Sequence, residues 1–141
     1  MTENYKILEK YVKDLSSETP NLETYLFVKD QIARYQLHID INTKPLKNNL
    51  IETNTIFRFE DKSGSKKKSY FEIIYATVIK INENIKNKEE LEKIILCDVQ
   101  QEIYPELEKT LLDLLHNSGY ADVKFDKKVD FEKLYKMRKV Q

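Results

Sequence analysis

The chain has 141 residues, with 24 Lys and Arg side chains balanced by 24 Asp and Glu side chains, and 40% of its residues are hydrophobic. Balanced charge argues against a dedicated nucleic-acid binder, and the hydrophobic content is too high for a disordered chain. The single cysteine, Cys97, excludes an intrachain disulfide, and no apolar stretch is long enough for a signal peptide or a membrane span, so we expect one cytosolic domain over residues 1–141.

The N-terminal segment Tyr5–Ser16 is predicted to be a strand, although its pattern is weak. Its apolar residues of one parity are Tyr5, Ile7, Tyr11 and Leu15, which should share one face. The next segment, Ser17–Ile32, is predicted to be a loop crossing, because Pro20 and Asn21 punctuate it.

Three further segments alternate apolar and polar residues with a period of two, which predicts half-buried strands. They cover Arg34–Thr43, Leu50–Glu60 and Ser69–Ile81. A turn signal at residues 44–49 and a loop around Gly64 separate them. Because these loops are too short for a helical crossover, the three strands should form an antiparallel meander.

From Lys88 onward the apolar residues follow helical spacing. Leu91, Ile94, Ile95 and Val99 predict one amphipathic helix. Pro105 should break that helix and start a second one, whose apolar stripe is Leu107, Leu111, Leu114 and Leu115. Asp130 is expected to cap a short C-terminal helix. The sequence therefore predicts an α+β fold, a four-stranded antiparallel sheet backed by two main helices plus a short C-terminal helix.

The segment Ser69–Ile81 is apolar at both parities. Phe71, Ile73, Tyr75, Ile79 and Ile81 lie on one face, and Tyr70, Ile74, Ala76 and Val78 lie on the other. The helices of the same chain can cover only one face of a lone antiparallel sheet. The second face is expected either to bind a second copy or another polypeptide, or to be covered by loops or the N-terminal strand.

No constellation of residues predicts catalysis. His38, His116 and Cys97 have no partner at metal-ligand spacing, and two glycines are too few for a phosphate-binding loop. The run Lys66–Lys68 is expected to be a solvated hairpin tip, with contact to an anionic partner as the alternative. We therefore expect a binding protein that needs no cofactor and is not an enzyme.

Several segments resemble the SecB protein-export chaperones. The run Lys10–Asn21, KYVKDLSSETPN, matches their N-terminal signature of tyrosine, any residue, Lys-Asp, an aliphatic residue, Ser, any residue, Glu, any residue and Pro. Further matches, in chain order, are Asp30-Gln31 before Leu37–Asn42, Tyr104-Pro105, and Val129–Tyr135. The chain differs from the family at Ala33, Thr77 and Glu108, where Pro, Gly and Arg are usual, and residues 82–102 align poorly.

The resemblance implies a cytosolic holding chaperone. Such proteins keep precursors unfolded, deliver them to the SecA translocase motor, need no cofactor and assemble as homotetramers, dimers of dimers. Asp14 and Glu18 match the signature acids that contact the zinc-bearing tail of SecA, and Glu72, with Tyr70 beside it, matches the same docking site. Phe71, Ile73 and Tyr75 match positions that affect oligomer assembly, and strand alternation places them opposite the docking group.

A client groove is expected between the sheet edge and the helices, with Phe27 and Tyr104 in its wall. Three alternatives remain from the sequence. One is a chaperone of the same fold dedicated to another partner, such as a toxin–antitoxin pair. The others are a small-molecule binder or enzyme, which would need a deep pocket with convergent polar groups, and a purely structural assembly subunit.

Overall fold

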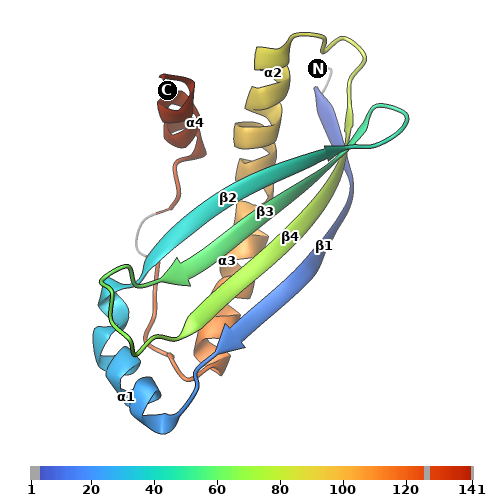
Figure 1. Ribbon diagram of the computed structural model, residues 1–141. Helices are drawn as coiled ribbons and strands as arrows, with labels where there is room; N and C mark the ends of the chain where they lie inside the picture. The colour runs from blue at the N-terminus through green and yellow to red at the C-terminus, as the bar shows by residue number, and fades with distance from the viewer. Residues whose placement is uncertain (1–3, 126–127, 141) are drawn as a thin grey trace.

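The computed structural model describes residues 4–125 and 128–140, and its centre is a four-stranded antiparallel sheet (Figure 1). The strands pair in the order β1-β4-β3-β2, with β1 at Tyr5–Glu18, β2 at Gln36–Pro45, β3 at Leu50–Glu60 and β4 at Tyr70–Ile81. All helices that cover the sheet lie behind the same face, which we call the inner face, and the opposite outer face is open (Figure 1). The predicted α+β fold is confirmed.

The meander of β2, β3 and β4 follows the predicted alternation. Leu37 and Ile39 lie opposite Phe59 and Phe57 on the inner face. The β2–β3 turn places Asn48 and Asn49 at φ values of 62° and 61°, as a tight hairpin turn of the mirror-image type requires. Asparagine tolerates this left-handed conformation better than most residues, which is why the turn signal was readable from the sequence.

β1 is longer and more irregular than its sequence pattern suggests. Two β-bulges, at Leu8 and Lys13, interrupt its antiparallel pairing with β4. Each bulge inserts one residue and so moves the following side chains to the other face. As a result Tyr11 lies opposite Ala76 on the outer face, whereas Leu15 lies opposite Ile73 on the inner face. The prediction that Tyr11 shares a face with Tyr5, Ile7 and Leu15 is therefore wrong.

Helix α1, Leu22–Gln31, occupies most of the segment predicted to be a loop. The side chain of Asn21 caps it by accepting a hydrogen bond of 2.8 Å from the backbone N–H of Thr24. The helix and the 3-10 turn Ile32–Arg34 carry the chain under one end of the sheet, from the β1 edge to the β2 edge (Figure 1). The loop prediction is wrong because Pro20 and Asn21 mark the start of a helix, not a loop throughout.

The two main helices form one continuous rod behind the sheet (Figure 1). It consists of α2 (Lys88–Lys93), a π-helical segment (Ile94–Asp98) and α3 (Val99–Asn117). The residues at each junction keep right-handed helical backbone angles, and Pro105 lies inside α3. The expected break at Pro105 is wrong, because the burial of Ile103, Tyr104 and Leu107 on the inner face of the sheet outweighs the lost N–H hydrogen bond.

The core lies between the inner face of the sheet and the α2–α3 rod. Its main cluster includes Phe57, Phe71, Leu107 and Leu111, and a second cluster joins Ile79 and Ile81 to the π-helical segment. Helix α4, Phe131–Val140, inserts Phe131 into the main cluster. Its first turn is capped as predicted, because Asp130 accepts a 3.0 Å hydrogen bond from the backbone N–H of Lys133. Within the described residues, no helix has the length and apolar character needed to cross a membrane.

Candidate functional site

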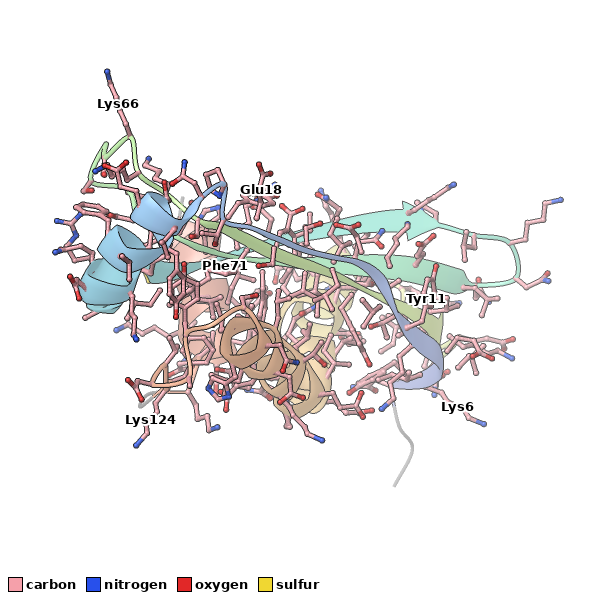
Figure 2. The ribbon with its side chains drawn as sticks, turned by 90° about the horizontal axis from the view of Figure 1, so that it is seen from below. Lys6, Tyr11, Glu18, Lys66, Phe71 and Lys124 are labelled. Carbon is pink, nitrogen blue, oxygen red and sulfur yellow. The ribbon has the colours of Figure 1, made fainter. Side chains whose placement is uncertain are left out.

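The outer face of the sheet brings together the four residues expected to dock the motor. Tyr70 pairs with Glu18, and Glu72 pairs with Ser16, so both lie beside the N-terminal signature on β1. Asp14 lies one step further along the same face, opposite Ile74. Glu18 points away from the helices in Figure 2, whereas Phe71 points toward them. This grouping depends on the register in which β1 pairs with β4, and that register cannot be read from the sequence pattern.

The acidic residues of this group differ in accessibility. Asp14 and Glu18 are exposed, and Tyr70 is 43% exposed, but Glu72 is only 9% exposed. Glu72 is held by Arg58, whose Nε lies 2.6 Å from Oε2 of Glu72. This contact raises the pKa of Arg58, so the guanidinium stays charged throughout the physiological range. Partial burial and the neighbouring carboxylate of Glu72 raise the pKa of Tyr70.

A second ion pair lies further along the outer face. Lys13, which stands beside Asp14 in the sequence, places its Nζ 2.9 Å from Oε1 of Glu52 on β3. The hydrogen bond lowers the pKa of Glu52 and raises that of Lys13, so both stay ionised at neutral pH. The charge of Lys13 is therefore neutralised across the sheet and does not cancel that of Asp14.

The centre of the outer face is apolar and has no helix over it. Ala76 is fully buried, and Ile56, Ile74 and Val78 are half-buried, between the side chains of the surrounding ion pairs. β1 lies beside β4 and does not cover this surface (Figure 1). The second apolar face predicted for the β4 segment is therefore a real feature of the fold, screened in part by its own polar neighbours.

The three residues expected at the oligomer interface lie on the inner face, in the core of the subunit. Phe71, Ile73 and Tyr75 are at most 5% exposed. The hydroxyl of Tyr75 donates a 2.7 Å hydrogen bond to Glu106 of α3, which also binds Lys10 of β1 at 2.7 Å. Burial raises the pKa of Tyr75, and the two hydrogen bonds lower that of Glu106. As direct contacts with a second subunit the three positions do not fit, because the α2–α3 rod covers them.

The two residues expected in the client groove are not brought together as an open wall. Tyr104 is 6% exposed and packs between the rings of Phe57 and Phe131 in the core. Phe27 lies on α1, and the Nζ of Lys67 sits 5.8 Å from the centre of its ring. Neither residue lines a described pocket. Their aromatic character led to the prediction, but in this fold it is used for packing.

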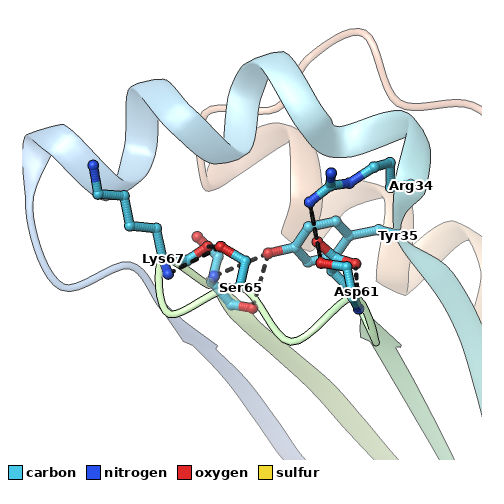
Figure 3. Close-up of polar contacts among 7 residues, drawn as sticks. Arg34, Tyr35, Asp61, Ser65 and Lys67 are labelled. Carbon is cyan, nitrogen blue, oxygen red and sulfur yellow. Dashed lines mark hydrogen bonds and ion pairs between the residues drawn. The ribbon is translucent and has the colours of Figure 1, made fainter.

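The loop between β3 and β4, residues 61–69, is bound to α1 and to the two residues that precede β2, Arg34 and Tyr35 (Figure 3). Arg34 and Asp61 form an ion pair of 2.9 Å, and Lys67 binds Glu23 at 2.6 Å. The backbone N–H of Ser69 donates a 3.0 Å hydrogen bond to the hydroxyl of Tyr35. Lys66 extends away from the body of the molecule, as expected of a solvated tip (Figure 2).

Two pockets lie below the edge strand β2, where a groove between the sheet edge and the helices was expected, but residues other than Phe27 and Tyr104 line them. One, of about 410 Å³, lies between β2 and the helices and is lined by Ile39, Asp40, Ile41, Asn42, Leu96, Phe131, Leu134 and Tyr135. The other, of about 320 Å³, lies near the start of β2 and is lined by Ile32, Ala33, Tyr35, Phe59, Asp122, Val123, Lys124 and Phe125. One feature of the sequence pointed to these pockets. β2 has apolar residues on its inner face, and because it is the last strand of the sheet, no further strand packs beside them.

The cysteine and the two histidines considered in the sequence analysis lie in surroundings that explain them by packing or local contacts. Cys97 is buried among apolar side chains, and burial raises the pKa of its thiol, which disfavours the reactive thiolate. His116 lies in the last turn of α3, and its Nε2 is 3.1 Å from the carbonyl oxygen of Val123. His38 lies 3.6 Å from Asp40 on the outer face of β2.

Comparison with known proteins identifies the family. The family model described as preprotein translocase subunit SecB matches residues 1–141. A relative from Pelagibacter ubique, named as a SecB protein-export protein, is 55% identical over 138 residues, which cover 98% of this chain and 99% of the relative. The protein-export protein SecB of Methylocella silvestris is 25% identical over 132 residues, covering 94% and 80% of the two chains.

Among solved structures, the fold is similar to that of the Rv1957 SecB-like chaperone of Mycobacterium tuberculosis, in a complex with a ChAD peptide from the Rv1956 HigA1 antitoxin. The TM-score is 0.65 at 10% identity, with 89% of this chain and 88% of that chain covered, so this likeness concerns the fold alone. The chain therefore belongs to the SecB family of protein-export chaperones, which are not enzymes.

Proposed function

We propose that this chain is a cytosolic holding chaperone that keeps unfolded precursor proteins competent for export and delivers them to the SecA motor. The observation that supports the proposal is that pockets and exposed carboxylates lie at different places on the sheet. Pockets lined by both apolar and polar side chains lie below the β2 edge, and exposed carboxylates lie on the outer face beside β1. A client and a motor could therefore be bound by the same subunit at once.

The β2 edge is the proposed client-binding region. In the described residues β2 pairs only with β3, so its other edge presents free backbone donors and acceptors. An extended client segment could add to this edge and place side chains into the two pockets beneath it. Each large apolar side chain that is fully buried contributes about 1.5–3 kcal/mol. Such contacts need no sequence motif, which suits a chaperone with many clients.

The outer face is the proposed motor-docking region. Asp14, Glu18 and Tyr70 are exposed on this face, and Glu72 lies between Tyr70 and Ile74 on β4. Surface carboxylates of this kind attract a basic partner and speed its encounter, and salt weakens the attraction. The docking of SecA at these residues remains the expectation that the family resemblance implies.

Assembly into a homotetramer, a dimer of dimers, is part of the proposal. The supporting observation is the second sheet edge, where β1 exposes apolar side chains along its length, including Leu8, Val12 and Leu15. A long apolar edge strand in a soluble protein is normally covered by a partner. Several client sites in one assembly would then act together through avidity.

Dedication to a toxin–antitoxin pair is not favoured. The relatives with the greater sequence identity bear the name of protein-export proteins. The solved SecB-like chaperone bound to an antitoxin peptide shares only 10% identity with this chain.

The test is light scattering of a denatured precursor that is diluted into buffer with or without the purified chain. The wild type should suppress aggregation. Leu134→Ser, in the larger pocket and 45% exposed, should weaken suppression, whereas Leu22→Ser, 70% exposed on the outward side of α1, should not. If the wild type does not suppress aggregation, the proposed holding function is wrong. If Leu134→Ser suppresses aggregation as fully as the wild type, the pocket that contains Leu134 does not bind clients.

A further inference from the structure

Glu72 stands in a row of residues that crosses all four strands of the outer face. Ser16 on β1, Glu72 on β4, Arg58 on β3 and His38 on β2 are successive cross-strand neighbours. Arg58 lies at the centre of the charges, because its Nη1 is 3.6 Å from Oδ2 of Asp40 while its Nε contacts Glu72 at 2.6 Å. One guanidinium therefore links two carboxylates on different strands.

The guanidinium covers Glu72 from the solvent side. The side chain of Glu72 is 12% exposed, whereas that of Arg58 is 37% exposed. A partner that approaches the outer face at this point meets a cation before it meets the carboxylate. To contact Glu72 directly, a basic partner would have to displace a short charge-assisted hydrogen bond.

The two acidic residues of β1 in the docking group, Asp14 and Glu18, differ from Glu72 because no cation among the described residues covers them. In the described part of the chain, neither Asp14 nor Glu18 takes part in an ion pair; Asp14 accepts a 2.6 Å hydrogen bond from the hydroxyl of Ser16. Both side chains are exposed. Their charges are available to a partner without the loss of an existing ion pair.

We infer that Arg58 is a specificity-determining residue of the outer face, which withdraws Glu72 from direct docking, so that Asp14 and Glu18 are the carboxylates of the β1 side that a cationic partner meets without displacing an ion pair. The inference rests on the proposed docking of SecA at this face. Glu72 then acts as a positioning residue, because it holds Arg58 flat against the sheet. A basic partner is attracted by the carboxylates of β1, and docking further across the sheet requires it to compete with Arg58 for Glu72 and Asp40.

The experiment measures the affinity of purified SecA for the full-length chaperone at low salt. Glu18→Gln should weaken binding about threefold or more, because one available charge is lost. Arg58→Gln should strengthen binding about threefold, because it releases Glu72 and Asp40 from their shared cation, while the glutamine can still donate a hydrogen bond to Glu72. A gain of affinity is not the result that a merely structural role of Arg58 would give.

The double change of Arg58→Gln with Glu72→Gln is the decisive variant, and it avoids leaving a buried carboxylate unpaired. It removes both charges of the pair, so binding should stay within about twofold of the wild type. If the double variant binds as weakly as Glu18→Gln, Glu72 contacts the motor directly and the inference is wrong. An Arg58→Gln variant that folds but gains no affinity also overturns it. Absence of any binding by the wild type would instead remove the proposed docking itself, and the inference with it.

Discussion

Gly119 ends helix α3 with a backbone φ of +105°, which favours glycine. The N–H of Tyr120 bonds back to the carbonyl of Leu115 at 2.9 Å, the closing hydrogen bond of a Schellman cap. Tyr25 of α1 packs on the bare Cα, and its hydroxyl donates a 2.8 Å hydrogen bond to the Gly119 carbonyl. A Cβ at this position would lie 2.6 Å from Cε1 of Tyr25. The glycine therefore ends α3 and leaves the space in which Tyr25 of α1 packs.

Gly119→Ala should lower the free energy of unfolding by about 2–3 kcal/mol, from backbone strain and from displacement of Tyr25. Gly64→Ala is the matched control, because Gly64 has a φ of +85° but nothing within 4 Å of the added methyl group. It should cost only the strain, about 1 kcal/mol. Urea denaturation measures both, and equal losses would show that the contact with Tyr25 is unimportant.

Asp61 ties the β3–β4 loop to Arg34. Its carboxylate accepts a 2.9 Å hydrogen bond from the backbone N–H of Ser63 and lies 2.9 Å from Nη2 of Arg34. The backbone hydrogen bond, with help from Arg34, holds the pKa of Asp61 below its ordinary value of 3.8. Because the folded state lowers this pKa, the stabilisation by Asp61 is present above the unfolded value and is lost as the pH falls through the folded one.

Asp61→Asn should therefore be less stable than the wild type at neutral pH. The gap in urea midpoint should be constant between about pH 5 and pH 7 and should narrow below about pH 4. Asp113→Asn, on the exposed side of α3, serves as the matched control for the loss of one carboxylate. A gap for Asp61→Asn that is the same at every pH would contradict the assignment.

At the scale of elements, a buried polar side chain of α3 forms a hydrogen bond to the sheet. Gln100 is fully buried; its Oε1 accepts a 2.8 Å hydrogen bond from Thr55 of β3, and its Nε2 donates to the carbonyl of Ile95 at 3.1 Å. Ile95 lies in the π-helical segment, where the wider turn changes the backbone hydrogen-bond pattern. Gln100 thus bonds to both the sheet and the irregular turn of the helix.

Gln100→Leu should destabilise the chain by about 2–4 kcal/mol, because it leaves the Thr55 hydroxyl and the Ile95 carbonyl buried without their partner. Gln101→Leu is the control, since the neighbouring side chain is exposed, and it should change stability by less than about 0.5 kcal/mol. The free energy of unfolding from urea titration compares them. Equal stability of the two variants would rule out a structural role for the Gln100 contacts.

At the scale of the whole molecule, one core between the sheet and the rod holds the fold together. Leu111 is fully buried at the centre of α3 and belongs to the main cluster. Its removal would leave a cavity that rigid strands on one side and a continuous helix on the other cannot readily close.

Leu111→Ala should lower the free energy of unfolding by about 2–5 kcal/mol. Leu22→Ala, at a leucine that is 70% exposed, should stay within about 0.5 kcal/mol of the wild type. Both are measured by thermal unfolding at one fixed protein concentration, because self-association would add a concentration-dependent term. A small loss for Leu111→Ala would mean that the core is held mainly by contacts other than α3.

Much of this protein follows from local physics in its sequence. The alternation over β2, β3 and β4, the Asn48-Asn49 turn and the change to helical spacing after Lys88 depend on neighbouring residues only, so they were predictable. The split of Phe71 from Tyr70 and Glu72 followed from strand alternation in the same way. The family resemblance supplied the four docking candidates, Asp14 and Glu18 from the N-terminal signature and Tyr70 and Glu72 from the β4 segment.

The tertiary structure decided everything that depends on pairing between distant segments. α1 was missed because it is apolar on its outward side as well as its inward side, and Pro105 continued a helix because packing outweighed one lost hydrogen bond. The bulges of β1, the burial of Tyr104, the pockets under β2 and the covering of Glu72 by Arg58 all follow from strand register and edge position. These contacts join residues far apart in the chain, so no local pattern carries them.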